Sequence, residues 1–146
     1  MQSGQPQIKI DTQNLIKAGT IPVIAAAVGG ILWILGFLGG ILGILFWALA
    51  LFAGYWYVNL ILKSGAKPTI VEVAINGAIL GAVVGLVYGV CSFIGQSITP
   101  CVSILGVNTY CANFFSIFRE LISGGIGGAV GAAAWYAYKS GMFKTS

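Results

Sequence analysis

The stretch IPVIAAAVGGILWILGFLGGILGILFWALALFAGYWYVNLIL, residues 21–62, runs for about forty residues without a charged side chain. An α-helix rises about 1.5 Å per residue, so one helix of this length would be about 60 Å long. The hydrocarbon core of a bilayer is only about 30 Å thick. The stretch is therefore about twice as long as one membrane span requires. It predicts a hydrophobic hairpin, in which two membrane-spanning helices fold back on each other.

The composition of the whole chain also indicates a membrane environment. Its 146 residues are 58% hydrophobic and 7% charged, and the mean hydropathy is +0.97. Soluble domains carry about 25% charged residues, so this chain cannot cover a water-facing surface. We expect one compact domain whose partners are the lipid bilayer and membrane subunits, either further copies or other chains. The net charge of +4 does not form a basic patch, and we expect no nucleic-acid partner.

Breaks in the apolar pattern predict an all-α, polytopic membrane protein with four transmembrane helices arranged as two hairpins. The predicted spans are residues 21–38, 41–62, 69–93 and 114–138. Gly39 and Gly40 are the predicted turn of the first hairpin, because glycine accepts the positive φ of a tight reversal. The basic, turn-rich loop at residues 63–68 separates the two hairpins.

The remaining segments are polar. Residues 1–20 are predicted as an N-terminal segment, either a solvated tail or a short interfacial helix capped by Asp11 or Thr12. Residues 95–113 carry no charge and are predicted as an ordered polar loop. Residues 140–146 form a C-terminal tail.

The lysines fix the predicted orientation. In the four-span arrangement all six fall on one side of the membrane: Lys9, Lys17, Lys63, Lys67, Lys139 and Lys144. Cytoplasmic loops are enriched in lysine and arginine, so both termini are predicted to be cytoplasmic. The expected location is the cytoplasmic membrane of a prokaryote, or an envelope derived from it. The alternative is a three-span protein in which part of residues 21–62 is interfacial or re-entrant.

Glycines recur at helical spacing in the last two predicted spans. The candidate helix-packing residues are Gly77, Gly81, Gly85 and Gly89 in the third span and Gly124, Gly128 and Gly131 in the fourth. Small residues let helix backbones approach closely in lipid, where packing replaces the hydrophobic effect. These faces are predicted to pack against each other or against further copies of the chain.

Arg119 and Glu120 are the charged pair near a span. Adjacent helical residues point about 100° apart, so we expect the two side chains not to face each other. Each is expected to meet a loop carbonyl, a lipid headgroup or a neighbouring subunit. The pair is therefore interpreted as an interface or anchoring feature.

The three cysteines all fall toward the predicted outer side, where oxidising conditions permit a disulfide. Cys101 and Cys111 are the preferred pair, because their bond would brace the polar loop. Closing a ring of about ten residues is worth about 2–3 kcal/mol. A bond between Cys91 and Cys101 is the alternative. The chain has no histidine, and its cysteine spacing fits no common zinc pattern, so no metal site is expected.

The span layout with its four-residue glycine spacing from Gly77 to Gly89 resembles small glycine-zipper membrane proteins of prokaryotes, and is similar in outline to Tim17-like translocase subunits. A second likeness is to the hydrophobic hairpin subunits of conjugation-type pili and of archaeal virus envelopes. These resemblances imply a helical membrane protein without chemistry of its own, and they carry no site residues to this chain.

The predicted function follows from what the sequence contains. It has no nucleotide-binding loop, catalytic triad or paired-carboxylate motif, so we expect neither an enzyme nor a bound cofactor. The leading hypothesis is a structural or assembly subunit of a membrane complex that oligomerises through its glycine-zipper faces. One alternative is a small oligomeric channel or transporter component. Another is a hydrophobic subunit of a virion envelope or conjugation-type pilus.

Overall fold

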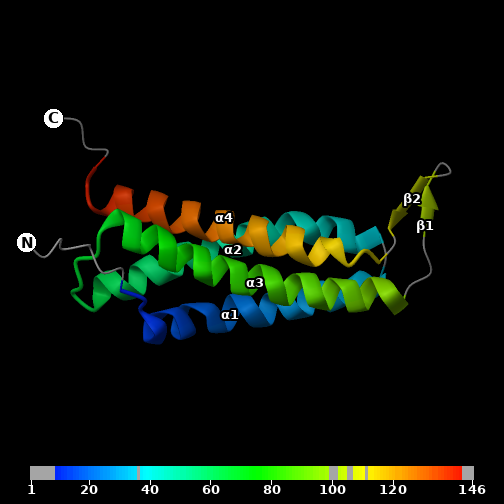
Figure 1. The fold of residues 1–146 in the computed structure, drawn as a ribbon, viewed down its shortest axis with the longest axis horizontal. Helices are drawn as coiled ribbons and strands as arrows, with labels where there is room; N and C mark the ends of the chain where they lie inside the picture. Colours follow the sequence, from blue (N-terminus) through cyan, green and yellow to red (C-terminus); the bar gives the residue numbers. More distant parts are fainter. Residues whose placement is uncertain (1–8, 36, 99–101, 105–106, 111, 143–146) are drawn as a thin grey trace, which may run out of the picture.

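The computed structural model describes residues 9–35, 37–98, 102–104, 107–110 and 112–142. Its main elements are four long helices: α1 (Thr12–Ile31), α2 (Phe37–Lys63), α3 (Ile70–Ile98) and α4 (Phe115–Lys139). A short 3-10 helix, η1 (Leu32–Leu35), follows α1, and two short strands, β1 (Val102–Ile104) and β2 (Val107–Tyr110), precede α4. The core fold is helical, as expected, and the strands stand outside the bundle (Figure 1).

The four helices alternate in direction, so the bundle has two distinct ends (Figure 1). The terminal end holds the start of α1, the connection between α2 and α3, and the end of α4. The hairpin end holds η1 and the two strands. Helices α3 and α4 form the most extensive interface, α4 also packs on α2, and α1 packs on α3 and α2. The order around the bundle is therefore α1, α2, α4, α3.

Helix α1 begins earlier than predicted. Asp11 is its N-cap, and the carboxylate accepts hydrogen bonds from the backbone N–H of Asn14 at 3.2 Å and from Asn14 Nδ2 at 2.7 Å. Such a cap satisfies backbone donors that have no partner in the first turn. From there the helix continues to Ile31 without interruption. The separate interfacial helix expected within residues 1–20 is thus the first part of a single long helix.

The predicted turn at Gly39 and Gly40 is wrong, because both residues lie inside α2. The preceding element, η1, ends at Leu35, and α2 begins at Phe37 and runs back along α1 (Figure 1). Glycine is common in membrane helices, where unpaired backbone groups are so costly that the helix persists through it. A pair of glycines in an apolar run is therefore a weaker turn signal than the same pair in a soluble protein.

The predicted polar loop at residues 95–113 is also partly wrong. Helix α3 extends to Ile98, and β1 and β2 then pair as an antiparallel hairpin. Val102 lies opposite Tyr110, and Ile104 lies opposite Val107, with a bulge after Val102.

Within the described residues, three helical segments are long and apolar enough to cross a membrane: 12–35, 44–63 and 70–98. The first includes η1. Helix α4 is not among them, since glycine, tyrosine and the charges of Arg119 and Glu120 lower its hydropathy. The protein is thus helical and membrane-type in composition, and three of its described helical segments could span a bilayer by length and apolar character.

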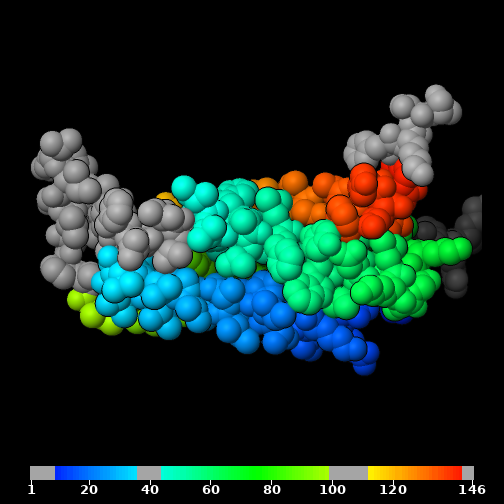
Figure 2. All heavy atoms as spheres, turned by 180° about the vertical axis from the view of Figure 1, so that it is seen from behind, coloured from blue at the N-terminus to red at the C-terminus, as the bar shows by residue number. Residues whose placement is uncertain are grey.

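Large apolar side chains cover the outside of the bundle, and small or aromatic ones fill its centre. Fully buried residues include Phe46, Ala53, Tyr57 and Val84. The view from behind shows α1 and α2 side by side, with α4 beyond α2 (Figure 2). The interior is packed like that of a soluble protein. The surface differs, because its apolar side chains suit lipid rather than water.

Candidate functional site

Glycines of α3 and α4 bring the two helix backbones into direct contact. A Cβ atom added at Gly81 would lie 2.9 Å from the carbonyl carbon of Gly124 and 2.9 Å from Cα of Gly128. One added at Gly77 would lie 2.5 Å from Cβ of Ala132. Real Cβ atoms are not found closer than 3.0 Å to such neighbours. Only glycine therefore permits this approach.

The contact continues toward the hairpin end. Gly85 lies against the backbone of Glu120, and a Cβ at Gly89 would meet Cα of Ile117 at 3.0 Å. Gly131 differs from the other candidates, because it faces the backbone of Leu51 in α2 rather than α3. Helix α4 is thus packed by glycine on two sides.

These glycine faces are occupied within one chain. Gly81, Gly85, Gly124 and Gly128 are each in contact with the opposite helix of the same hairpin. A second copy of the chain would reach them only if α3 and α4 separated. The structure therefore assigns the glycine residues to the internal packing of the second hairpin, and association of copies through these faces stays a prediction without structural support.

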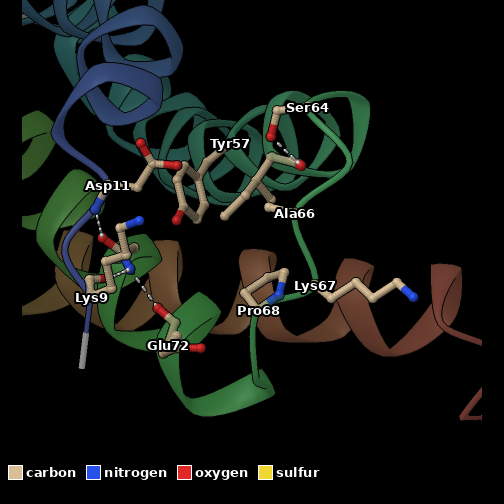
Figure 3. Close-up of a pocket in the computed structure, with 10 residues that line it drawn as sticks. Lys9, Asp11, Tyr57, Ser64, Ala66, Lys67, Pro68 and Glu72 are labelled. Atoms are coloured by element: carbon tan, nitrogen blue, oxygen red, sulfur yellow. Dashed lines mark hydrogen bonds between the residues drawn. The ribbon is translucent and has the colours of Figure 1, made fainter. Parts of the chain in front are cut away.

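A polar pocket of about 360 Å³ opens at the terminal end between α1, α2 and α3. We call it the terminal-end pocket, and its polar lining includes Lys9, Asp11, Tyr57, Lys67, Glu72 and Asn76. In Figure 3 the Tyr57 ring points into this pocket beside Asp11, whereas Lys67 extends away from it.

Asn76 lines the terminal-end pocket, and it is only 1% exposed. Its Oδ1 accepts a hydrogen bond from the backbone N–H of Asp11 at 3.1 Å. Its Nδ2 donates to the carbonyl of Lys9 at 3.1 Å and to that of Glu72 at 2.8 Å. One amide thus fastens the segment before α1 to the first turns of α3.

A second polar side chain of this pocket is also hydrogen-bonded. The Glu72 carboxylate accepts from the backbone N–H of Thr69 at 2.7 Å and from its hydroxyl at 3.0 Å. Tyr57 differs from these residues, because its buried hydroxyl has no hydrogen-bond partner among the described residues. The arrangement braces the terminal end, and it leaves one unsatisfied hydroxyl within it.

A second pocket, of about 420 Å³, lies at the hairpin end and is lined by residues of η1, α2, α3 and α4. We call it the hairpin-end pocket, and its lining includes Trp33, Trp47, Tyr88, Ser92, Arg119 and Glu120. Trp33 Nε1 donates to the hydroxyl of Tyr88 at 2.9 Å, which joins η1 to α3. The Tyr88 ring stacks on Phe46 with 4.5 Å between ring centroids.

The expectation that Arg119 and Glu120 would not face each other is wrong. Arg119 Nη2 and Nε donate to Glu120 Oε1 at 2.6 Å and 3.0 Å. The long arginine side chain curls back along the helix surface, so the angle between neighbouring Cβ atoms does not keep the groups apart. The Arg119 side chain is 76% exposed and that of Glu120 only 11%. The buried charge of the pair is therefore the negative one.

The cysteine prediction falls largely outside the described residues, since Cys101 and Cys111 are not among them. Cys91 is described, and it is a free, half-buried thiol on α3. A Cβ at Gly30 of α1 would lie 2.6 Å from its Cβ. In the described parts of the chain no group of three metal-ligating side chains occurs.

Sequence reasoning did not single out the two pockets. Asn76 carried a signal, as a lone amide in an apolar helix, but its partners in the segment before α1 lie more than sixty positions away. Trp33 and Tyr88 are likewise brought together only by the packing of η1 on α3. Comparisons with protein-family models, with curated proteins and with solved structures find no match to this chain.

Proposed function

We propose that the protein is a four-span membrane subunit, with α4 as the fourth span. Helix α4 contains 25 residues, so it is about 37 Å long, which is enough to cross a bilayer. It lies beside α3 from the contact of Ile117 with Gly89 to that of Ala132 with Gly77. Wherever α3 crosses the membrane, α4 accompanies it.

The outward side of α4 supports the same proposal. It presents a stripe of exposed apolar side chains at helical spacing: Phe115, Phe118, Ile122, Ile126 and Val130. Such a stripe suits lipid and would be costly in water. Part of the low hydropathy of α4 comes from the glycines that it turns inward. By the lysine distribution the terminal end would face the cytoplasm of a prokaryote, or the inside of an envelope derived from one.

The function that we propose for this bundle is structural: it serves as an assembly subunit of a membrane complex. The observation that carries the proposal is its closed, tightly packed interior. Between the two pockets the bundle is filled by buried apolar residues such as Ala50, Ala53 and Val84. The backbone contact between α3 and α4 leaves these helices little freedom to move apart. A rigid module with an apolar exterior is suited to holding partners in a bilayer.

Partners would approach the lipid-facing sides of the helices, because the glycine faces are already used inside the chain. The test places single cysteines on outward positions, as in I24C on α1 and I122C on α4, for cross-linking in native membranes. Cross-linked products that contain the same partner or a second copy are expected. A monomer without cross-linked or copurifying protein would contradict the proposal.

A second candidate function, a small transporter component, is favoured by one observation. Pockets that contain charged side chains open at opposite ends of the bundle, so a solute could enter it from either side. Purified protein in liposomes separates the candidates. Solute or ion flux that depends on Glu120 would favour transport over the structural role. Absence of flux together with a fixed complex would favour the structural role.

A further inference from the structure

The hairpin-end pocket combines a buried carboxylate with aromatic rings, which is an unusual pairing inside a membrane bundle. Glu120 is 8% exposed as a residue, and it lines the same cavity as Trp33, Trp47 and Tyr88. A carboxylate removed from water requires a compensating positive charge. Aromatic faces attract cations, among them the ammonium groups of ligands.

The carboxylate is only partly satisfied by the protein. Both hydrogen bonds from Arg119 go to Oε1, and among the described residues no donor reaches Oε2. The guanidinium itself belongs to a side chain that is 76% exposed, so it sits at the rim and has access to solvent or headgroups. The exposed guanidinium is therefore the partner of this ion pair that another cation can displace from Glu120.

The serines of this pocket strengthen the argument. Each hydroxyl donates its proton to a backbone carbonyl: Ser92 to Gly89, Ser116 to Asn113, and Ser123 to Glu120. A hydroxyl whose proton is committed still offers its oxygen as an acceptor. The three serines thus add acceptor atoms, and no free donors, to the lining. Acceptors, a carboxylate and π faces together match a positively charged ligand.

We infer that the hairpin-end pocket binds an organic ammonium group, which contacts the Glu120 carboxylate and the aromatic rings while Arg119 is displaced toward the rim. The cavity of about 420 Å³ has room for a small substituted ammonium. The ammonium group comes either from a lipid headgroup, such as that of phosphatidylethanolamine or phosphatidylcholine, or from a water-soluble amine. This inference does not depend on the structural role proposed above.

The first experiment titrates the purified full chain in detergent with choline and follows tryptophan fluorescence, since Trp33 and Trp47 line the pocket. The control ligand is dimethylbutanol, the uncharged isostere in which carbon replaces the nitrogen. The second experiment places the chain in nanodiscs of mixed phosphatidylethanolamine and phosphatidylglycerol with identical acyl chains. Native mass spectrometry then identifies the lipids that remain bound.

Opposite effects of the two neighbouring charges distinguish binding from a structural role. Glu120→Gln should weaken binding of choline or phosphatidylethanolamine by about tenfold or more, because it removes a charge-assisted contact. Arg119→Gln should tighten the same binding, because it removes the competing cation. The matched controls, Glu72→Gln and Lys139→Gln, change the same charges at the terminal end and should leave binding unaltered.

Each result has a defined meaning. Saturable choline binding without lipid enrichment assigns the site to a soluble amine, and enrichment of phosphatidylethanolamine assigns it to a headgroup. If Glu120→Gln does not fold, the response to Arg119→Gln still decides. The inference is overturned if choline and its uncharged isostere bind alike while lipids are retained equally, or if Arg119→Gln weakens binding.

Discussion

Replacement of Gly81 by alanine tests the central packing feature, the backbone contact between α3 and α4. The new Cβ would lie 2.9 Å from two backbone atoms of α4 and still closer to the Gly124 carbonyl oxygen. Ordinary contact begins at 3.4 Å. Because the obstructing atoms belong to the backbone, a rotamer change cannot relieve the clash. The helices must move apart by at least about half an ångström, which weakens packing at the neighbouring glycines too.

Overpacking of this kind costs about 1–3 kcal/mol, and rigid backbone neighbours place Gly81 at the upper end. Alanine recovers up to about 1 kcal/mol as a better helix former than glycine. We therefore expect Gly81→Ala to lower the free energy of unfolding by about 1–2 kcal/mol. Gly125→Ala is the matched control, because its Cβ would meet its nearest neighbours at 3.5 Å and 3.6 Å, which is ordinary contact.

The control should be neutral or stabilising by up to about 1 kcal/mol, so the two variants should differ by about 1–3 kcal/mol. The assay is reversible unfolding in mixed micelles of dodecylmaltoside and SDS, monitored by circular dichroism. Equal stability of the two variants would refute the proposed contact. A change in oligomeric state at unchanged stability would show that Gly81 packs between chains instead.

Three further predictions address the ends of the bundle. Asn76→Ala should raise hydrogen exchange of the backbone amides just before α1 by about tenfold, because their anchor is lost, and unchanged exchange would contradict the clamp. Tyr57→Phe should leave the free energy of unfolding unchanged or raise it by up to about 1 kcal/mol, because an unpaired buried hydroxyl is removed; a clear loss of stability would mean that the hydroxyl is hydrogen-bonded. Alkylation of the unreduced protein followed by mass spectrometry should label one cysteine if Cys101 and Cys111 are joined, and three reactive thiols would rule that bond out.

The hydrophobicity of a segment can be read from its own residues. The membrane character of the chain and the helical spacing of its glycines could therefore be predicted from the sequence. The uncharged stretch of residues 21–62 is too long for one span, and it folds as two helices. The glycine spacing from Gly77 to Gly89 identified a close-packing face without reference to a structure. Turn positions were harder to predict. In lipid the need for backbone hydrogen bonds outweighs the tendency of Gly39 and Gly40 to form a turn.

Relationships between distant segments were decided by the tertiary structure alone. The row of glycines in α3 predicts that another backbone packs closely against it. Only the packing shows that this backbone is α4 of the same chain. The same holds for Asn76, whose partners precede α1, and for Glu120, which lines one pocket with Trp33 of η1 and Tyr88 of α3. Composition and periodicity determine the solvent and shape of each helix, because these are local properties. Which faces meet, and which charge is buried, depends on side-chain fit summed over the whole bundle.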